Sequence, residues 1–173
     1  MAESIQASGR EIRVAGLVTA LLLLITLPLP DMMPVINRYL FCMPPAYLAA
    51  GFLGANCELT GAGVRVAGLA AMHVTLACSP IKFFLLTFAL FAGLAVARRV
   101  SLRTWLWLVP AAYGITLVTN TSRLILCWYG DVLTRHYFPA QFHIKLHLLI
   151  GMFVFLPVLI VAYEFIQRRI RHA

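Results

Sequence analysis

Four long runs of apolar residues, separated by short charged or turn-forming segments, organise the sequence. They cover about residues 14–29, 78–97, 105–128 and 147–166. Each is about as long as a helix needs to be to cross roughly 30 Å of hydrocarbon at 1.5 Å per residue. The pattern therefore predicts an all-α integral membrane protein, a single membrane domain over residues 1–173 with about four transmembrane helices.

The composition supports a membrane protein and excludes several other classes. Hydrophobic residues make up 62% of the chain and charged residues only 12%, and the mean hydropathy is +0.89. A single core formed by a chain of this size could not bury that excess of apolar side chains. A soluble enzyme, a DNA-binding domain and a disordered linker are therefore all excluded.

The net charge of +8 indicates topology in a chain of this kind, and no nucleic-acid partner is expected. Eight of the fourteen basic residues lie in three clusters that flank the apolar runs: Arg10 and Arg13; Arg98, Arg99 and Arg103; Arg168, Arg169 and Arg171. An even number of crossings puts all three clusters on one side, and basic residues favour the cytoplasmic side. We therefore expect a protein of the cytoplasmic (inner) membrane with both termini cytoplasmic and outer loops at 30–77 and 129–146.

The first outer loop is too long and too apolar to be a simple connection. Residues 39–53 contain no internal charge and predict an interfacial or re-entrant helix, because a fifth crossing would break the charge pattern. Short alternating stretches at 64–66 and 73–76, among glycines, predict a small hairpin in the second half of the loop.

Cys78 opens the second apolar run, with Pro80 in the first helical turn. A thiol at a helix N-terminus lies at the positive end of the helix dipole, and Lys82 follows at i+4 on the same face; both favour the thiolate. The alternative is a small buried apolar residue beside a lysine that extends towards the membrane surface.

Polar residues also lie near the outer ends of the third and fourth runs. Asn120 and Arg123 share a helical face at i,i+3, and an arginine at that depth requires a cavity, a partner or an anion, unless it reaches the outer headgroups. His147 opens the fourth run, with Gly151 one turn later on a face that a neighbouring helix could approach closely. Arg123 or His147 could instead be an interfacial residue without a function. His143 and His147 could bind a metal together only with a third ligand, and none lies at metal-binding spacing.

The predicted topology places Cys78, Arg123 and His147 in the same leaflet at similar depth. A thiol nucleophile, a cation able to stabilise an oxyanion and an imidazole base are the groups that acyl transfer through a thioester requires. The three residues together therefore predict one catalytic site at the outer face, without metal or cofactor.

These residues resemble a known family. Ala77-Cys78-Ser79, Asn120-Thr121-Ser122-Arg123 and His147-Leu148-Leu149-Ile150-Gly151 are similar, in order and in their position at the outer ends of spans, to the motifs of the exosortase/archaeosortase family of membrane cysteine transpeptidases. The resemblance covers about residues 64–160. Pro80 departs from the glycine usual after Cys-Ser, and the chain is more compact than larger members.

The resemblance implies a protease and transpeptidase with Cys78 as nucleophile, Arg123 as substrate and oxyanion partner, His147 as acid/base and Asn120 in support. Its partners would be exported proteins whose C-terminal sorting signal comprises a short motif, an apolar helix and a basic tail. The enzyme would cut near that signal and pass the substrate to an acceptor at the cell surface.

A quinone-linked membrane thiol-disulfide oxidoreductase is the alternative, since such enzymes also have four spans and outward-facing cysteines. That chemistry needs exchanging cysteine pairs, typically vicinal, and the sequence contains no vicinal pair. Cys42 and Cys57 could form a stabilising disulfide or remain two buried thiols.

Overall fold

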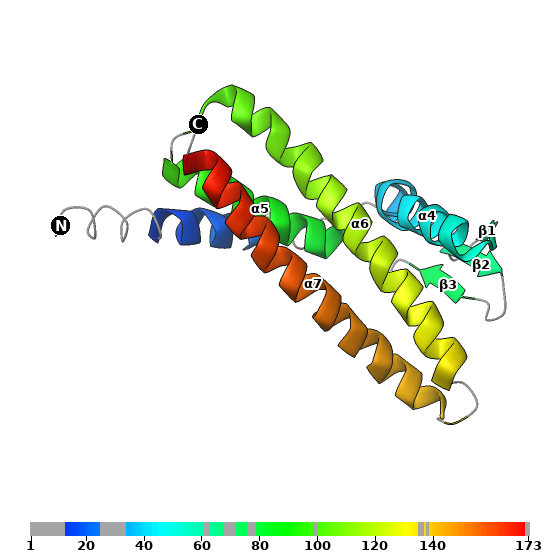
Figure 1. Ribbon diagram of the computed structural model, residues 1–173. Helices are drawn as coiled ribbons and strands as arrows, with labels where there is room; N and C mark the ends of the chain where they lie inside the picture. The colour runs from blue at the N-terminus through cyan, green and yellow to red at the C-terminus, as the bar shows by residue number, and fades with distance from the viewer. Residues whose placement is uncertain are drawn as a thin grey trace. The chain divides into compact units, whose positions relative to one another are not determined.

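The protein is mostly helical, with one small sheet (Figure 1). The computed structural model describes residues 13–24, 34–60, 63–67, 72–75, 79–98, 100–134, 137 and 139–171. An N-terminal helix spans Arg13–Leu24. The other elements are α3 (Pro34–Ile36), the π-helix η1 (Asn37–Cys42), α4 (Met43–Leu53), β1 (Asn56–Thr60), β2 (Gly63–Ala67), β3 (Met72–Thr75), α5 (Ile81–Arg98), α6 (Leu102–Thr134) and α7 (Ala140–Arg171).

Two of the described helices are long and apolar enough to cross a membrane, namely Ile81–Arg98 and the segment Lys145–Arg168 of α7. The prediction of four spans is therefore not confirmed. Helix α6 is 33 residues long, but its centre contains five consecutive polar residues, 119–123. For the first run, the structure describes a helix only to Leu24, and residues 25–29 lie outside the described part of the chain.

Contacts between residues divide the chain into two compact units, and unit 1 contains residues 1–32, 82–116 and 159–173. Its N-terminal helix packs closely on α5: the Thr19 hydroxyl donates a hydrogen bond to the Ala89 carbonyl at 3.1 Å. A Cβ atom on Gly93 would overlap Oγ1 of Thr19 and lie 2.5 Å from the Ala15 carbonyl oxygen. The buried core of this unit comprises Phe91, Ala95, Leu108, Ala112 and Ala162.

Unit 2 contains residues 33–81 and 117–158, and its antiparallel sheet has the strand order β1-β2-β3. Val64 and Val66 of β2 are buried whereas Arg65 between them is exposed, as the alternation of side chains along a strand requires. Val64 pairs with Val74 of β3. The predicted hairpin is confirmed, and β1 extends it to three strands.

Helix α4 covers the buried face of the sheet (Figure 1). Its small residues Ala46, Ala49 and Ala50 form one core with the strand valines, to which α6 adds Leu124 and Trp128. The helix ends at Gly54, which adopts the left-handed conformation (φ 60°, ψ 30°) that favours glycine. A helix within residues 39–53 is thus confirmed, while its interfacial or re-entrant position stays a prediction.

Most of the segment 129–146, predicted as an outer loop, is helical, while its position on the outer side stays a prediction. Helix α6 continues to Thr134 and α7 already begins at Ala140. Gly130 and Asp131 look like loop residues in the sequence, but both contact α7 inside unit 2, and these contacts stabilise the helical conformation beyond the apolar run.

Candidate functional site

Within unit 2, α6 and α7 pack against each other as antiparallel helices. A Cβ atom on Gly130 would lie 3.1 Å from Cδ2 of Leu146 and 3.4 Å from Cδ1 of Ile150. Further contacts join Asp131 to His147 and, earlier on α6, Arg123 to residues later on α7. Residues that come earlier on α6 contact residues that come later on α7. The two helical segments therefore run in opposite directions.

Arg123 lies directly against the backbone of α7. A Cβ atom on Gly151 would be 3.3 Å from Nε of Arg123 and 3.9 Å from its Cδ and Cζ. The absence of a side chain at Gly151 therefore provides the space for the guanidinium stem. The sequence predicted that this glycine would admit a neighbouring helix, and the group that it admits is the arginine side chain.

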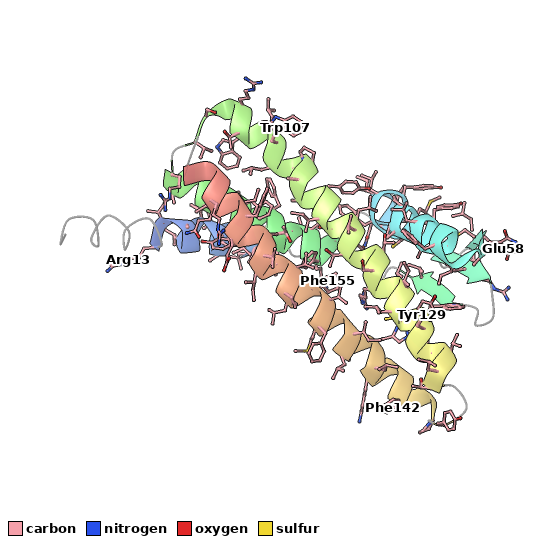
Figure 2. The ribbon with its side chains drawn as sticks, in the orientation of Figure 1. Arg13, Glu58, Trp107, Tyr129, Phe142 and Phe155 are labelled. Carbon is pink, nitrogen blue, oxygen red and sulfur yellow. The ribbon has the colours of Figure 1, made fainter. Side chains whose placement is uncertain are left out.

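Phe155, one turn after Gly151, forms the second surface that holds Arg123. Cζ of the arginine lies 5.5 Å from the centroid of the Phe155 ring, which is within range of a cation–π interaction. The phenylalanine projects from α7 on the side of α6, as Figure 2 shows. The Phe155 ring and the backbone at Gly151 together restrict where the guanidinium can lie.

His147 is paired with Asp131. Its Nε2 lies 3.0 Å from Oδ2 of Asp131, and both side chains are partly exposed, by 30% and 26%. A carboxylate only accepts hydrogen bonds, so Nε2 carries the proton of this contact. When the imidazole is neutral, Nδ1 is consequently the nitrogen with a free lone pair.

Asp131 is a candidate site residue that the sequence pattern alone does not single out. The apolar run of the third predicted span ends near residue 128, so the sequence predicts a loop at Asp131. The signal was nevertheless present: Arg123, Cys127 and Asp131 follow at i, i+4 and i+8, one face of a continuous helix. The pairing itself depends on how α6 packs on α7, which a single sequence does not state.

Asn120 is completely buried, with 0% exposure. Neither Oδ1 nor Nδ2 has a hydrogen-bond partner among the described residues. Thr121 and Ser122, in contrast, bond back to the carbonyls of Leu117 and Val118 at 2.8 and 3.0 Å. An unsatisfied buried polar group costs about 1–3 kcal/mol of stability, so the Asn120 amide needs a partner beyond the described residues.

The start of α5 is held by Ser79. Its hydroxyl accepts a hydrogen bond from the Ile81 N–H at 3.2 Å, which is the N-cap contact, and Pro80 takes the first position after the cap. The same hydroxyl donates to Oδ1 of Asn37 in η1. The predicted nucleophile, Cys78, directly precedes this cap in the sequence and lies outside the described residues.

The structure thus brings some of the predicted site residues together and leaves others unconnected. Arg123 contacts Gly151, and His147 lies one turn before that glycine, about 6 Å along the axis of α7. Lys82 is exposed at the second residue of α5 and belongs to unit 1. Its predicted support of Cys78 stays a prediction.

Among the described residues, the cysteines Cys42, Cys57 and Cys127 form no disulfide. The structure therefore favours two separate thiols over a Cys42–Cys57 disulfide. Sγ of Cys57 lies 3.6 Å from the Ala46 carbonyl oxygen, to which the thiol donates. Partial burial raises the pKa of the Cys57 thiol above its ordinary value, which lowers the fraction of reactive thiolate.

Chemically, the site offers a fixed cation beside a paired imidazole. Arginine can stabilise an oxyanion, and a neutral imidazole oriented by a carboxylate can accept and return a proton. Within the described part of the chain, no three histidine, cysteine or acidic side chains are grouped as metal ligands. No protein-family model, characterised protein or solved structure matches the chain.

Proposed function

We propose that this chain is a membrane cysteine protease and transpeptidase of the exosortase/archaeosortase kind. It cleaves a C-terminal sorting signal from exported proteins by way of a thioester and transfers them to a surface acceptor. Cys78 is the nucleophile, Arg123 binds the oxyanion and His147 is the acid/base. Asp131 is added to this set as the residue that positions His147.

One observation carries the proposal: the pairing of His147 with Asp131 one turn from the glycine against which Arg123 lies. A histidine at the membrane surface with no function would need no carboxylate partner. An arginine that served only as a topology signal would extend to the headgroups instead of stacking on Phe155. An oriented base and an oriented cation on facing helices are what acyl transfer needs.

In the first half-reaction, the Cys78 thiolate attacks the scissile carbonyl carbon, and the carbonyl oxygen becomes an oxyanion beside Arg123. Collapse of this intermediate reforms the carbonyl and breaks the C–N bond, while the imidazolium of His147 donates its Nδ1 proton to the leaving amine. The N-terminal part of the substrate is then held as a thioester on Cys78, and the cleaved signal leaves.

In the second half-reaction, neutral His147 accepts a proton through Nδ1 from the acceptor nucleophile as that nucleophile attacks the thioester. The oxyanion forms again beside Arg123, and the thiolate is the leaving group. In both half-reactions the Asp131 carboxylate accepts a hydrogen bond from Nε2–H of His147. Its negative charge stabilises the imidazolium that exists between the two proton transfers.

The surface of α7 supports a membrane setting for this chemistry. Only 11% of the most apolar stretch within Lys145–Arg168 is buried inside the protein. Large apolar side chains such as Leu148, Met152 and Phe153 are mostly exposed, a pattern that fits contact with lipid acyl chains. With the three basic clusters, this supports four spans in the cytoplasmic membrane, cytoplasmic termini and an outward-facing site.

The test begins with a candidate substrate. A protein encoded nearby that ends in a short motif, an apolar helix and arginines is co-expressed with the enzyme, and its processing is followed by size and mass. Wild type should process it, whereas Cys78→Ala should leave it uncut. When the acceptor is withheld, a hydroxylamine-sensitive adduct between the enzyme and the N-terminal part of the substrate should accumulate.

Arg123→Lys is the matched variant for the cation. Lysine keeps the charge but lacks the planar fork, so most activity should be lost while the protein still inserts. Processing by the Cys78→Ala protein at the wild-type rate would refute the enzyme assignment. Full turnover by Arg123→Lys would remove Arg123 from the mechanism and leave the nucleophile untouched.

A further inference from the structure

We propose that Asn120 is a substrate-binding residue that pairs with the peptide main chain beside the scissile bond. This inference rests on the proposed function and adds to it the group that recognises the substrate. It starts from the fully buried carboxamide, whose Oδ1 and Nδ2 are both without hydrogen-bond partners among the described residues.

Both polar atoms of the Asn120 carboxamide lack a partner among the described residues, whereas Thr116, one turn earlier on α6, has a single such atom, its hydroxyl oxygen. The next two polar residues of α6, Thr121 and Ser122, satisfy their hydroxyls on carbonyls of their own helix. The other described buried asparagine, Asn37, accepts a hydrogen bond from Ser79. Asparagine is also a poor helix former, so neither local structure nor packing explains why this residue stands in the middle of a long helix.

The chemistry of the side chain identifies the missing partner. A carboxamide offers an acceptor oxygen and an adjacent N–H donor in one plane. The N–H and C=O of one residue in an extended peptide present the complementary pair, so the two can form two parallel hydrogen bonds. Such recognition reads the main chain and not the side chains of the ligand.

The spacing on α6 places this contact next to the proposed chemistry. Asn120 and Arg123 are three residues apart, about 4.5 Å along the helix axis and on one face. Extended peptide residues repeat about every 3.3 Å. A peptide whose scissile carbonyl lies at Arg123 would therefore present its main chain to Asn120 one or two residues away.

The first experiment tests whether the amide is unsatisfied in the free protein. Asn120→Leu keeps the branched shape without polar atoms, so its Tm in detergent should rise above that of wild type. Asn37→Leu is the matched control, a buried asparagine that has a partner, and its Tm should fall. A fall for Asn120→Leu as large as for Asn37→Leu would show that the Asn120 amide is already satisfied, which overturns the inference.

The second experiment observes the ligand contact with Asn120 intact, and therefore does not depend on how the variant folds. The chain has three asparagines, Asn37, Asn56 and Asn120. Selective ¹⁵N-asparagine labelling consequently gives three side-chain amide signals, and Asn37→Leu and Asn56→Asp assign them by elimination. The probe is N-acetyl-trialanine N-methylamide, added to the Cys78→Ala protein so that no chemistry occurs.

We expect a saturable shift of the Asn120 amide, while the exposed Asn56 amide does not move. A depsipeptide probe, in which lactate replaces alanine and removes the N–H groups, should bind at least about tenfold more weakly, the effect of losing roughly 1.4 kcal/mol of hydrogen bonding. No shift up to the solubility limit of the probe, or an equal shift of all three amides, would overturn the inference.

The two proposals fail in different ways. Substrate processing by the Cys78→Ala protein refutes the transpeptidase, whatever the asparagine signals do. Wild-type processing by Asn120→Leu, together with a raised Tm, refutes the binding role of Asn120 and leaves the transpeptidase standing.

Discussion

Replacing Gly151 by alanine should separate activity from stability, because this glycine provides space for Arg123. The added Cβ would lie 3.3 Å from Nε and 3.9 Å from Cδ and Cζ of the arginine. Ordinary carbon contacts are about 3.5–4.0 Å. The guanidinium therefore has to move by a few tenths of an ångström, away from α7 and from its stacking position on Phe155.

The free energy of unfolding of the Gly151→Ala variant should be close to that of wild type. A displacement this small of a long side chain costs less than the roughly 1–3 kcal/mol of core overpacking. Alanine in place of a helical glycine contributes about 0.5–1 kcal/mol in the opposite direction. Activity is more sensitive: since a misplacement of about 1 Å can cost about 10²-fold in rate, Gly151→Ala should slow acylation by up to about tenfold.

The assay is the single-turnover rate of adduct formation, with Tm measured on the same preparation. Gly51→Ala is the matched control, because Gly51 is a helical glycine of unit 2 with no atom within 4 Å of the added Cβ. It should raise Tm with unchanged activity. If Gly151→Ala gained as much stability as Gly51→Ala and kept the full rate, Arg123 would not lie against Gly151.

Three further substitutions or labelling experiments test other contacts. Asp131→Asn should slow processing by about 10²- to 10⁴-fold, because the amide cannot fix the His147 tautomer and charge as a carboxylate does. A processing rate equal to that of wild type at each pH from 6 to 8 would contradict this positioning role. Gly93→Ala should destabilise unit 1 by about 1–3 kcal/mol through overlap with Thr19, and an unchanged Tm would show that the two helices are not in contact. Cys57 should react with maleimide more slowly in the folded protein than in denaturant, because its raised pKa lowers the thiolate fraction; equal rates would contradict its burial.

Local patterns in the sequence predicted local structure well. The alternation around Val64 predicted a hairpin because a strand that buries one face must alternate, and β2 and β3 form that hairpin. Pro80, predicted in the first helical turn, lies directly before the first residue of α5, Ile81. The end of α6 was not predictable in this way. Gly130 and Asp131 favour loops when considered alone, and their helical conformation depends on contacts with α7.

The candidate site was also predictable from the sequence only in part. The shared face of Asn120 and Arg123 follows from helical spacing, and the sequence was sufficient to find it. The partners of these residues are tertiary: Gly151 and Phe155 hold Arg123, and Asp131 holds His147. A single sequence does not state how two helices pack, so it could propose the reactive groups and not the residues that orient them.

The π-helix η1, which precedes α4, also affects how this part of unit 2 could change in length. In η1 the Met43 N–H donates to the Arg38 carbonyl five residues earlier, so the wide turn holds one residue more than an α-helical turn. Deleting the exposed Tyr39 would leave a regular turn and keep α4 facing the strands. The same deletion inside α4 would rotate the following residues by about 100° and turn Ala49 and Ala50 out of the core. Deletion of one residue is therefore expected to be tolerated in η1 and not in α4.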